Sequence, residues 1–273
     1  MVNGKAFRPR DKGLTGDLLV IKAELEVQES WIAEPISLNI VYEDSSLIVI
    51  NKPMATVVHP AAGHSEGTLL NGLLHHCTQL NRLPRAGIVH RLDKDTTGLM
   101  VVAKTLQAHT SLVQQLQARN VTREYEAIVS GTLTAGGTID LPLGRHPVNR
   151  KKRAVLEKGQ EAITHYTVIK RFPAHTHILV KLETGRTHQI RAHLSHMKYP
   201  IVGDKLYGGR LRIPRGCSND LATTLRRFER QSLHAKSLGL IHPNSGKSMR
   251  WTSELPQDMQ KLLSVLQQDI QCH

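Results

Sequence analysis

The sequence predicts an α+β domain with a mixed, mainly antiparallel sheet and flanking helices and loops. Three observations lead to this class. Short apolar segments of strand-like composition recur along the chain, several of them face each other across turns, and only a few helical segments are inserted between them. With 273 residues, of which 40% are hydrophobic, the chain can bury a sizeable core.

The first predicted elements are a hairpin, a helix and a second pair of strands. Residues 38–42 and 47–51 are apolar and flank an acidic, serine-containing turn, so we expect paired strands. Residues 68–77 carry leucines at helical spacing. Residues 87–92 and 99–103 have strand-like composition on either side of a polar turn, and we expect both to be strands.

The rest of the chain continues this mixture of helices and hairpins. Residues 105–119 predict an amphipathic helix with Leu112, Val113 and Leu116 buried, and residues 124–129 predict a strand. Two further hairpins are expected, with strands at 163–171 and 177–182 and at 232–241 and 248–252. The remaining helices are expected at 187–197 and 257–270.

The net charge of the chain is +13, and the pI of about 9.9 points to a polyanionic partner. The charge is unevenly distributed, because residues 1–50 carry a net −3 and residues 51–273 carry +16. Aromatic residues make up only 4% of the chain, so a surface built mainly on base stacking is not expected. Nucleic acid is the favoured partner, with a merely soluble basic surface as the alternative.

Two basic clusters, at 145–158 and 205–230, are interrupted by Gly, Pro and Asn and therefore predict loops. Such loops can follow a phosphate backbone, and each cation near a phosphate releases counterions. Solvated surface loops remain the alternative for either cluster. The residues assigned to RNA contact here are Arg145, Arg150, Lys151, Lys152, Arg153, Arg210 and Arg212.

Several protein classes are disfavoured by the sequence. No run of 18 apolar residues predicts a membrane span, and the first residues lack the apolar core of a secretion signal. Cys77, Cys217 and Cys272 are widely spaced, so we expect neither a disulfide framework nor a zinc site. We expect a cytoplasmic protein.

Two polar stretches are the strongest candidates for chemistry. In His90–Leu99, Arg91 and Asp93 would alternate on one strand face and present a cation and a carboxylate to one cleft. A simple ion pair with a turn is the alternative interpretation. In Gly185–His193, Arg186 lies at a predicted helix start, where positive potential favours an anion.

The histidines of the second stretch do not have the spacing of a metallohydrolase helix. His188, His193 and His196 lack the two-histidine pair with an adjacent Glu, and no other carboxylate or thiolate lies beside them. We also find no Gly-rich phosphate loop and no nucleophile-elbow serine. The expected chemistry therefore uses Asp, Tyr and Arg, with no metal and no cofactor.

The chain resembles the RluA/RluD-type pseudouridine synthases that act on ribosomal RNA. The resemblance extends from Ile36 to the C-terminus and is closest to the RluD subgroup, which modifies the helix 69 loop of large-subunit RNA. The motifs that carry it are HRLDKDTTGL at 90–99, REYEA at 123–127, LETGRTHQIRAH at 182–193, NKP at 51–53, VVHP at 57–60 and VGDKLYGG at 202–209.

The resemblance implies a pseudouridine synthase fold with a central active-site cleft, and it implies a role for each matching residue. Asp93 matches the catalytic nucleophile, and Arg91 matches the arginine that enters the RNA stack when the target uridine leaves it. Tyr125 matches the tyrosine that packs on the flipped base and is a candidate for handling its C5 proton. Arg186 matches the arginine paired with the catalytic carboxylate. His90 and Arg191 are assigned to RNA contact.

The resemblance also implies a division of the chain. Residues 1–26 are similar to the last part of an S4-like RNA-binding domain, residues 27–37 form a linker, and residues 38–273 form the catalytic domain. Our leading hypothesis is a monomeric, metal-free enzyme that isomerises uridines of large-subunit ribosomal RNA. The alternatives are a non-catalytic ribosome-assembly protein on the same scaffold and a pseudouridine synthase that acts on other RNA such as tRNA. A metal-dependent nuclease would need a carboxylate or histidine cluster that the sequence lacks.

Overall fold

The computed structural model describes residues 14–18, 31–60 and 66–271. The chain divides into two compact units, Met1–Ile32 and Ala33–His273. Most of the S4-like segment predicted at 1–26 lies outside the described residues, as does part of the predicted linker at 27–37, so this division stays a prediction. All the named helices and strands lie in the second unit.

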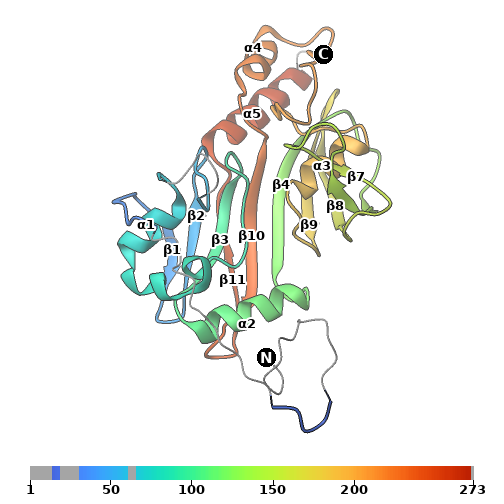
Figure 1. Ribbon diagram of the computed structural model, residues 1–273. Coiled ribbons are helices and arrows are strands. Elements are labelled where there is room, and N and C mark those ends of the chain that lie inside the picture. Colours follow the sequence, from blue (N-terminus) through green and yellow to red (C-terminus); the bar gives the residue numbers. More distant parts are fainter. Residues whose placement is uncertain (1–13, 19–30, 61–65, 272–273) are drawn as a thin grey trace. The chain divides into compact units, whose positions relative to one another are not determined.

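A nine-stranded sheet forms the centre of this unit (Figure 1). Its order is β1-β2-β3-β10-β4-β9-β8-β5, and β11 pairs with β10 outside this path. A separate two-stranded sheet consists of β6 and β7. The strands are β1 (Ile40–Glu43), β2 (Leu47–Lys52), β3 (Thr97–Ala103), β4 (Thr122–Ser130), β5 (Gly137–Asp140), β6 (Leu143–Arg145), β7 (Arg153–Val155), β8 (Ile163–Arg171), β9 (His175–Leu182), β10 (Leu233–Ile241) and β11 (Ser248–Thr252).

Strand β10 joins the two halves of the sheet. It pairs with β3 in parallel over two residues, and with β4 and β11 in antiparallel fashion. The parallel contact requires a glycine at position 98, because a Cβ there would lie 2.3 Å from the carbonyl oxygen of Ala235. The φ of Gly98 is also +113°, a value that other residues rarely adopt. Every other pairing of named strands is antiparallel, as predicted.

Helices lie at both ends of the sheet and beside it. In Figure 1, α2 crosses one end of the sheet, whereas α4 and α5 lie at the opposite end. None of the helices in the described part of the chain has the length and apolar composition needed to cross a membrane. The helices are α1 (Leu69–His76), α2 (Leu106–Gln117), α3 (Gln189–His196), α4 (Asn219–Arg227) and α5 (Gln257–Gln271), with 3-10 turns at Thr78–Arg82 and Pro84–Gly87.

The α+β prediction, the three hairpins and four of the helices are confirmed, with boundaries shifted by a few residues. Two of the helix starts have clear chemical causes. The hydroxyl of Thr68 accepts the N–H of Asn71 before α1, and the hydroxyl of Thr105 accepts the N–H of Ala108 before α2. Helix α4 and the short strands β5, β6 and β7 were not predicted.

The predicted strand at 87–92 is wrong. The chain instead forms the 3-10 turn at Pro84–Gly87, and Ile88 makes only an isolated bridge to Val102. The N–H of Val101, which a further strand would use, donates to Nε2 of His90 at 3.0 Å. The ladder therefore does not continue, and Arg91 and Asp93 do not alternate on a strand face.

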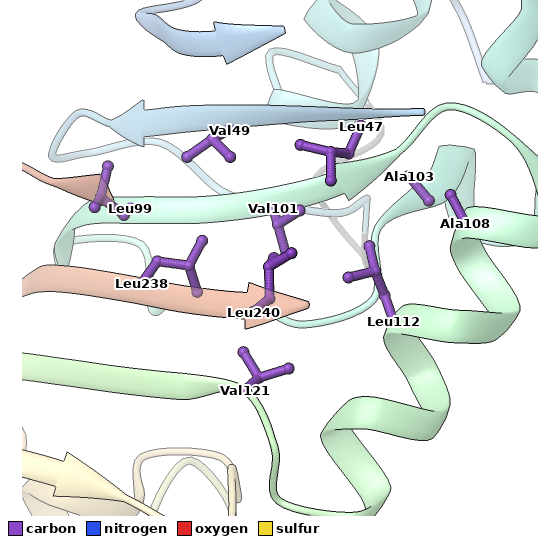
Figure 2. Packing of buried hydrophobic residues seen from close by; sticks show 10 residues of the cluster. All are labelled: Leu47, Val49, Leu99, Val101, Ala103, Ala108, Leu112, Val121, Leu238 and Leu240. Atoms are coloured by element: carbon purple, nitrogen blue, oxygen red, sulfur yellow. The ribbon is translucent and has the colours of Figure 1, made fainter. Parts of the chain in front are cut away.

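A buried apolar cluster joins β2, β3 and β10 to α2 (Figure 2). Leu112 and Ala108 are the buried residues of α2, and both belong to this cluster, with Ala108 lying beside Ala103 (Figure 2). Val113 and Leu116 are only half-buried, in contrast to the prediction. Both residues line a cleft, and Leu116 also packs against the edge of the apolar cluster.

Candidate active site

A cleft of about 790 Å³ opens between the two halves of the sheet. Its walls come from the loop before β3, the end of α2, β4, and the segment between β9 and α3. Most of the predicted catalytic and motif residues converge there, since its lining includes His90, Arg91, Asp93, Tyr125, Arg186, His188 and Arg191. Residues far apart in the sequence thus form one polar site.

Asp93 lies in a turn just before β3, where its carbonyl oxygen accepts the N–H of Thr96. Its Oδ2 accepts a hydrogen bond of 2.8 Å from Nη1 of Arg191. Arg191 is itself held by Asp204, through a 2.7 Å bond from Nε to Oδ2 and a 2.9 Å bond from Nη2 to Oδ1. The Asp204 side chain is fully buried. A bidentate pair of this kind fixes the plane of the guanidinium, and this in turn orients Asp93.

Burial lowers the pKa of Arg191, but the bonds and charge of Asp204, followed by the charge of Asp93, outweigh burial and raise the pKa above its usual value. Arg191 therefore remains a cation between two acids. Its guanidinium is committed to these two carboxylates and the residue is buried. It was assigned to RNA contact, and its contacts are instead those of an internal anchor.

The expected pairing of Arg186 with Asp93 is wrong in this structure. The Nε of Arg186 donates to the carbonyl oxygen of Glu161 at 3.0 Å, and the side chain is exposed. The reason is local, because Arg186 precedes α3, whereas Arg191 lies in the first turn of that helix and reaches Asp93. Arg186 still lines the cleft.

Tyr125 comes from the centre of β4 and is 6% exposed. Burial raises its pKa, the charge of Arg123 opposes this rise, and the charge of Asp93 adds to it. The hydroxyl is therefore neutral near pH 7. Arg123 is also buried, and its Nη2 donates to the carbonyl oxygen of Glu183 at 2.9 Å.

The turn that carries Asp93 is fixed by four side chains. The fully buried Lys52 donates from Nζ to the carbonyl oxygen of Lys94 at 2.8 Å. Burial lowers the pKa of Lys52 to about 8, although Asp95 and Asp93 oppose this shift. The next three residues are held in the same way, by Arg230 on the Asp95 carbonyl (3.2 Å), Gln231 on the Thr96 hydroxyl (3.0 Å) and His234 on the Thr97 hydroxyl (2.8 Å). Side chains from elsewhere in the fold thus hold four consecutive residues after Asp93.

Comparison with known proteins adds independent information. The family model for RNA pseudouridylate synthase matches residues 46–196. The ribosomal large subunit pseudouridine synthase D of Pseudomonas aeruginosa is 61% identical over 268 residues, which cover 98% of this chain and 84% of that protein. This chain belongs to the RNA pseudouridylate synthase family. The protein of the same name from Escherichia coli K12 is 52% identical over 274 residues, covering all of this chain and 84% of the relative.

Solved structures of the family agree with this assignment. Human RNA pseudouridylate synthase domain containing 4 superposes with a TM-score of 0.65 at 25% identity, covering 84% of this chain and 93% of that one. Human RNA pseudouridylate synthase domain containing 1 has a TM-score of 0.61 at 24% identity, covering 86% and 97%. The predicted pseudouridine synthase fold is confirmed.

In this RNA pseudouridylate synthase, the two candidate RNA-contact residues of the HRLD motif lie in different environments. Arg91 is exposed at the cleft. His90 accepts the N–H of Val101, and burial, followed by the charge of Arg123, lowers its pKa to about 3. His90 is therefore neutral and is anchored to β3; it also lines the cleft, and RNA contact by His90 stays a prediction.

The first basic cluster lies on the hairpin of β6 and β7. Arg145 and Arg153 face each other in its register, and Arg150 and Lys151 are exposed at its turn. Lys152 lies over the ring of Tyr207, with Nζ 5.7 Å from the ring centroid. In the second cluster, Arg210 and Arg212 are exposed in the loop before α4. RNA binding by either cluster stays a prediction.

Three residues of the site had no assigned role. Asp204 and Tyr207 both belong to the VGDKLYGG segment, and His188 belongs to the GRTHQIR segment. The Nε2 of His188 lies 3.8 Å from Oδ1 of Asp93. The motif resemblance was the available signal, but it did not indicate which residues turn inward. No cluster of three or more candidate metal ligands occurs among the described residues.

Proposed function

We propose that this chain converts specific uridines of large-subunit ribosomal RNA to pseudouridine, with Asp93 as the nucleophile. The observation that carries the proposal is the Asp93 carboxylate, held by Arg191 at 2.8 Å in a cleft that Tyr125 also lines. The RNA class follows the names of the two bacterial relatives, which are ribosomal large subunit enzymes. Within that RNA, the helix 69 loop is the proposed target.

The chemistry that these residues would perform needs a flipped base. A uridine in folded RNA must leave its stack before the glycosidic bond can be reached, at a cost of a few kcal/mol. The exposed guanidinium of Arg91 would fill the vacated space. The N1–C1′ bond then breaks, the base rotates and a C5–C1′ bond forms, while C5 loses a proton and N1 gains one. The reaction neither adds nor removes atoms overall.

Each side chain has a distinct part in this scheme. Asp93 provides the negative nucleophile, and the Arg191–Asp204 pair holds it in place. Tyr125 would pack on the flipped base, and its hydroxyl is the candidate for handling the C5 proton. Arg186, exposed beside the cleft, would contact the RNA backbone. We further propose that the protein acts as a cytoplasmic monomer, that residues 1–26 are S4-like, and that residues 38–273 form the catalytic domain.

Tritium release from uridine labelled at C5 in unmodified large-subunit RNA tests the proposal. Wild type should release tritium, and Asp93→Asn should lose at least about 10⁴-fold in rate, since the nucleophile is removed. Asp95→Asn is the matched control, because it changes the neighbouring carboxylate, and it should remain within about tenfold of wild type. A silent wild type, or an Asp93→Asn variant with full activity, would contradict the proposal.

The alternative of a non-catalytic assembly protein makes a different prediction in the same experiment. Such a protein would bind the RNA without releasing tritium. Addition of EDTA separates the metal-dependent alternative, because the proposed mechanism predicts an unchanged rate. Mapping pseudouridines in cells that lack the gene would test the helix 69 target against tRNA.

A further inference from the structure

We infer that Tyr207 is a positioning residue that orients Asp93 through His188 and Arg191 and connects this carboxylate to the basic β6–β7 hairpin. The inference rests on the proposed catalytic role of Asp93. Tyr207 itself lies behind the two side chains that contact the carboxylate, so it acts through them and not on the substrate.

The two oxygens of Asp93 face different partners. Oδ2 is bonded to Arg191, whereas Oδ1 lies 3.8 Å from Nε2 of His188. Arg191 and His188 both contact the aromatic ring of Tyr207. The guanidinium carbon of Arg191 is 5.1 Å from the ring centroid, within the range of a cation–π contact. The His188 ring meets the same ring edge-on, at 5.7 Å and 89°.

The Tyr207 hydroxyl also selects a tautomer of His188. Its oxygen accepts the N–H of Arg153 at 2.7 Å, and Nδ1 of His188 is 3.1 Å away. Among the described residues, Nδ1 of His188 is the acceptor within reach of the hydroxyl proton. If Tyr207 donates to Nδ1, the ring proton of the neutral imidazole lies on Nε2 and points toward Asp93. Burial lowers the pKa of His188, which favours this neutral form.

The backbone around Tyr207 is itself fixed to the site. Oδ1 of Asp204 accepts the N–H groups of Leu206 and Tyr207, both at 2.9 Å. The hydroxyl of Ser195, on α3, donates to the carbonyl oxygen of Tyr207 at 3.1 Å. The ring is therefore held by the same aspartate that holds Arg191, and the three residues form one unit.

The basic hairpin touches this unit directly. Arg153, on β7, donates its backbone N–H to the Tyr207 hydroxyl. The Lys152 ammonium lies 5.7 Å from the centroid of the Tyr207 ring. The exposed Arg150 and Lys151 occupy the turn of the same hairpin. The position of the hairpin and the contacts of Tyr207 therefore depend on each other.

A nitrogen-15 NMR experiment on the free wild-type protein tests the tautomer without any change to the site. The imidazole signal of His188, assigned by its loss in His188→Gln, should show a neutral ring protonated at Nε2. A ring protonated at Nδ1 would overturn the inference. In Tyr207→Phe the preference for Nε2 should weaken, and an unchanged ring would likewise count against it.

Kinetics test the positioning role. Tyr207→Phe should lower kcat about tenfold, the effect expected from loss of the hydrogen bond to His188, while the RNA Kd stays within about twofold. Tyr166→Phe is the matched control, because Tyr166 lies on β8 outside the cleft lining, and it should retain the wild-type kcat. A Tyr207→Phe variant with the wild-type kcat, or with its whole loss in Kd, would overturn the inference.

A double variant tests whether the effect passes through His188. Tyr207→Phe combined with His188→Gln should be no slower than the worse single variant, and fully additive losses would contradict the coupling. Failure of the inference about Tyr207 can be distinguished from failure of the proposed function. An inactive wild type would refute the function, whereas an inactive Asp93→Asn beside a fully active Tyr207→Phe would refute only the role of Tyr207.

Discussion

Arg191 makes two bonds to Asp204 and one to Asp93, so the residue that contacts the proposed nucleophile is anchored mainly by an acid that no substrate touches. Asp204 is fully buried and also accepts two backbone N–H groups of the following turn. The orientation of the Asp93 carboxylate is therefore determined by Asp204, a residue that does not contact it directly.

Asp204→Asn should lower both activity and stability. Breaking a buried ion pair leaves Arg191 without its principal counter-charge, which costs about 3–5 kcal/mol. We expect urea unfolding to show this loss, and kcat to fall by at least about 100-fold because Asp93 loses its orientation. Asp269→Asn is the control, since Asp269 is equally buried but bonds the N–H of Ser218 at 2.7 Å. It should lose stability with little change in kcat per folded molecule. Equal effects of the two variants on kcat would contradict the anchoring role.

Lys52 predicts an unusual pH dependence of stability. Burial lowers its pKa to about 8 in the folded protein, against a usual value of 10.5. Between these two pH values the unfolded chain binds more protons than the folded one, so the contribution of Lys52 becomes more favourable as the pH rises. The unfolding free energy of wild type minus that of Lys52→Met should increase by up to about 3 kcal/mol from pH 8 to pH 10.5. Lys247→Met, at an exposed position, should show no such slope. A flat difference for Lys52→Met would show that the ammonium is not destabilised by burial.

Arg119 bridges two acids at the edge of the cleft. Its guanidinium lies 2.6 Å from Glu161 and 2.8 Å from Glu183, and all three residues line the cleft. Replacing both acids by Gln frees a cation and removes two charges that repel phosphate. The RNA Kd should fall severalfold, and the slope of log Kd against log salt should steepen by about one. Glu254→Gln is the control, because this exposed acid lies outside the cleft lining and should leave the slope unchanged. A weaker RNA complex in the double variant would contradict this competition.

The turn of the β6–β7 hairpin should contribute to RNA affinity through charge alone. Arg150→Gln with Lys151→Gln removes two exposed cations and leaves the residues around Tyr207 intact. Filter binding at several salt concentrations should give a weaker complex whose salt slope is smaller by about two. Lys247→Gln with Lys261→Gln is the control, because it makes an equal charge change at exposed positions outside both basic clusters and should leave the slope unchanged. If the hairpin variant keeps the wild-type slope, the cluster is a solvated loop.

The sequence was sufficient for the class of fold because its hairpins and amphipathic helices are encoded locally. Turn residues and alternating apolar positions specify the pair β8–β9, for example, without reference to the rest of the chain. The failure at 87–92 has a non-local cause, since a side chain, His90, occupies the N–H that a further strand would have used. The short strands β6 and β7 are three residues each and give too little periodicity to detect.

The site residues show the same contrast between what local sequence encodes and what depends on distant residues. Asp93 and Tyr125 were identified as candidates because a family resemblance marks the motif, and the structure places both at one cleft. The choice of Arg186 in place of Arg191 failed because sequence spacing does not reveal which arginine the start of α3 turns inward. Asp204 and Tyr207 act through contacts made across the fold, and no local pattern distinguishes them from turn residues.

The anchors of the catalytic turn also have a consequence for synthesis of the chain. Asp93 to Thr97 are made in the first half of translation, but their partners Arg191, Arg230, Gln231 and His234 are made much later. Arg230 is in turn paired with Asp258, on α5. A nascent chain that ends before Arg230 therefore lacks three of the four side chains that hold the catalytic turn, and one that ends before α5 still lacks the acid that pairs with Arg230.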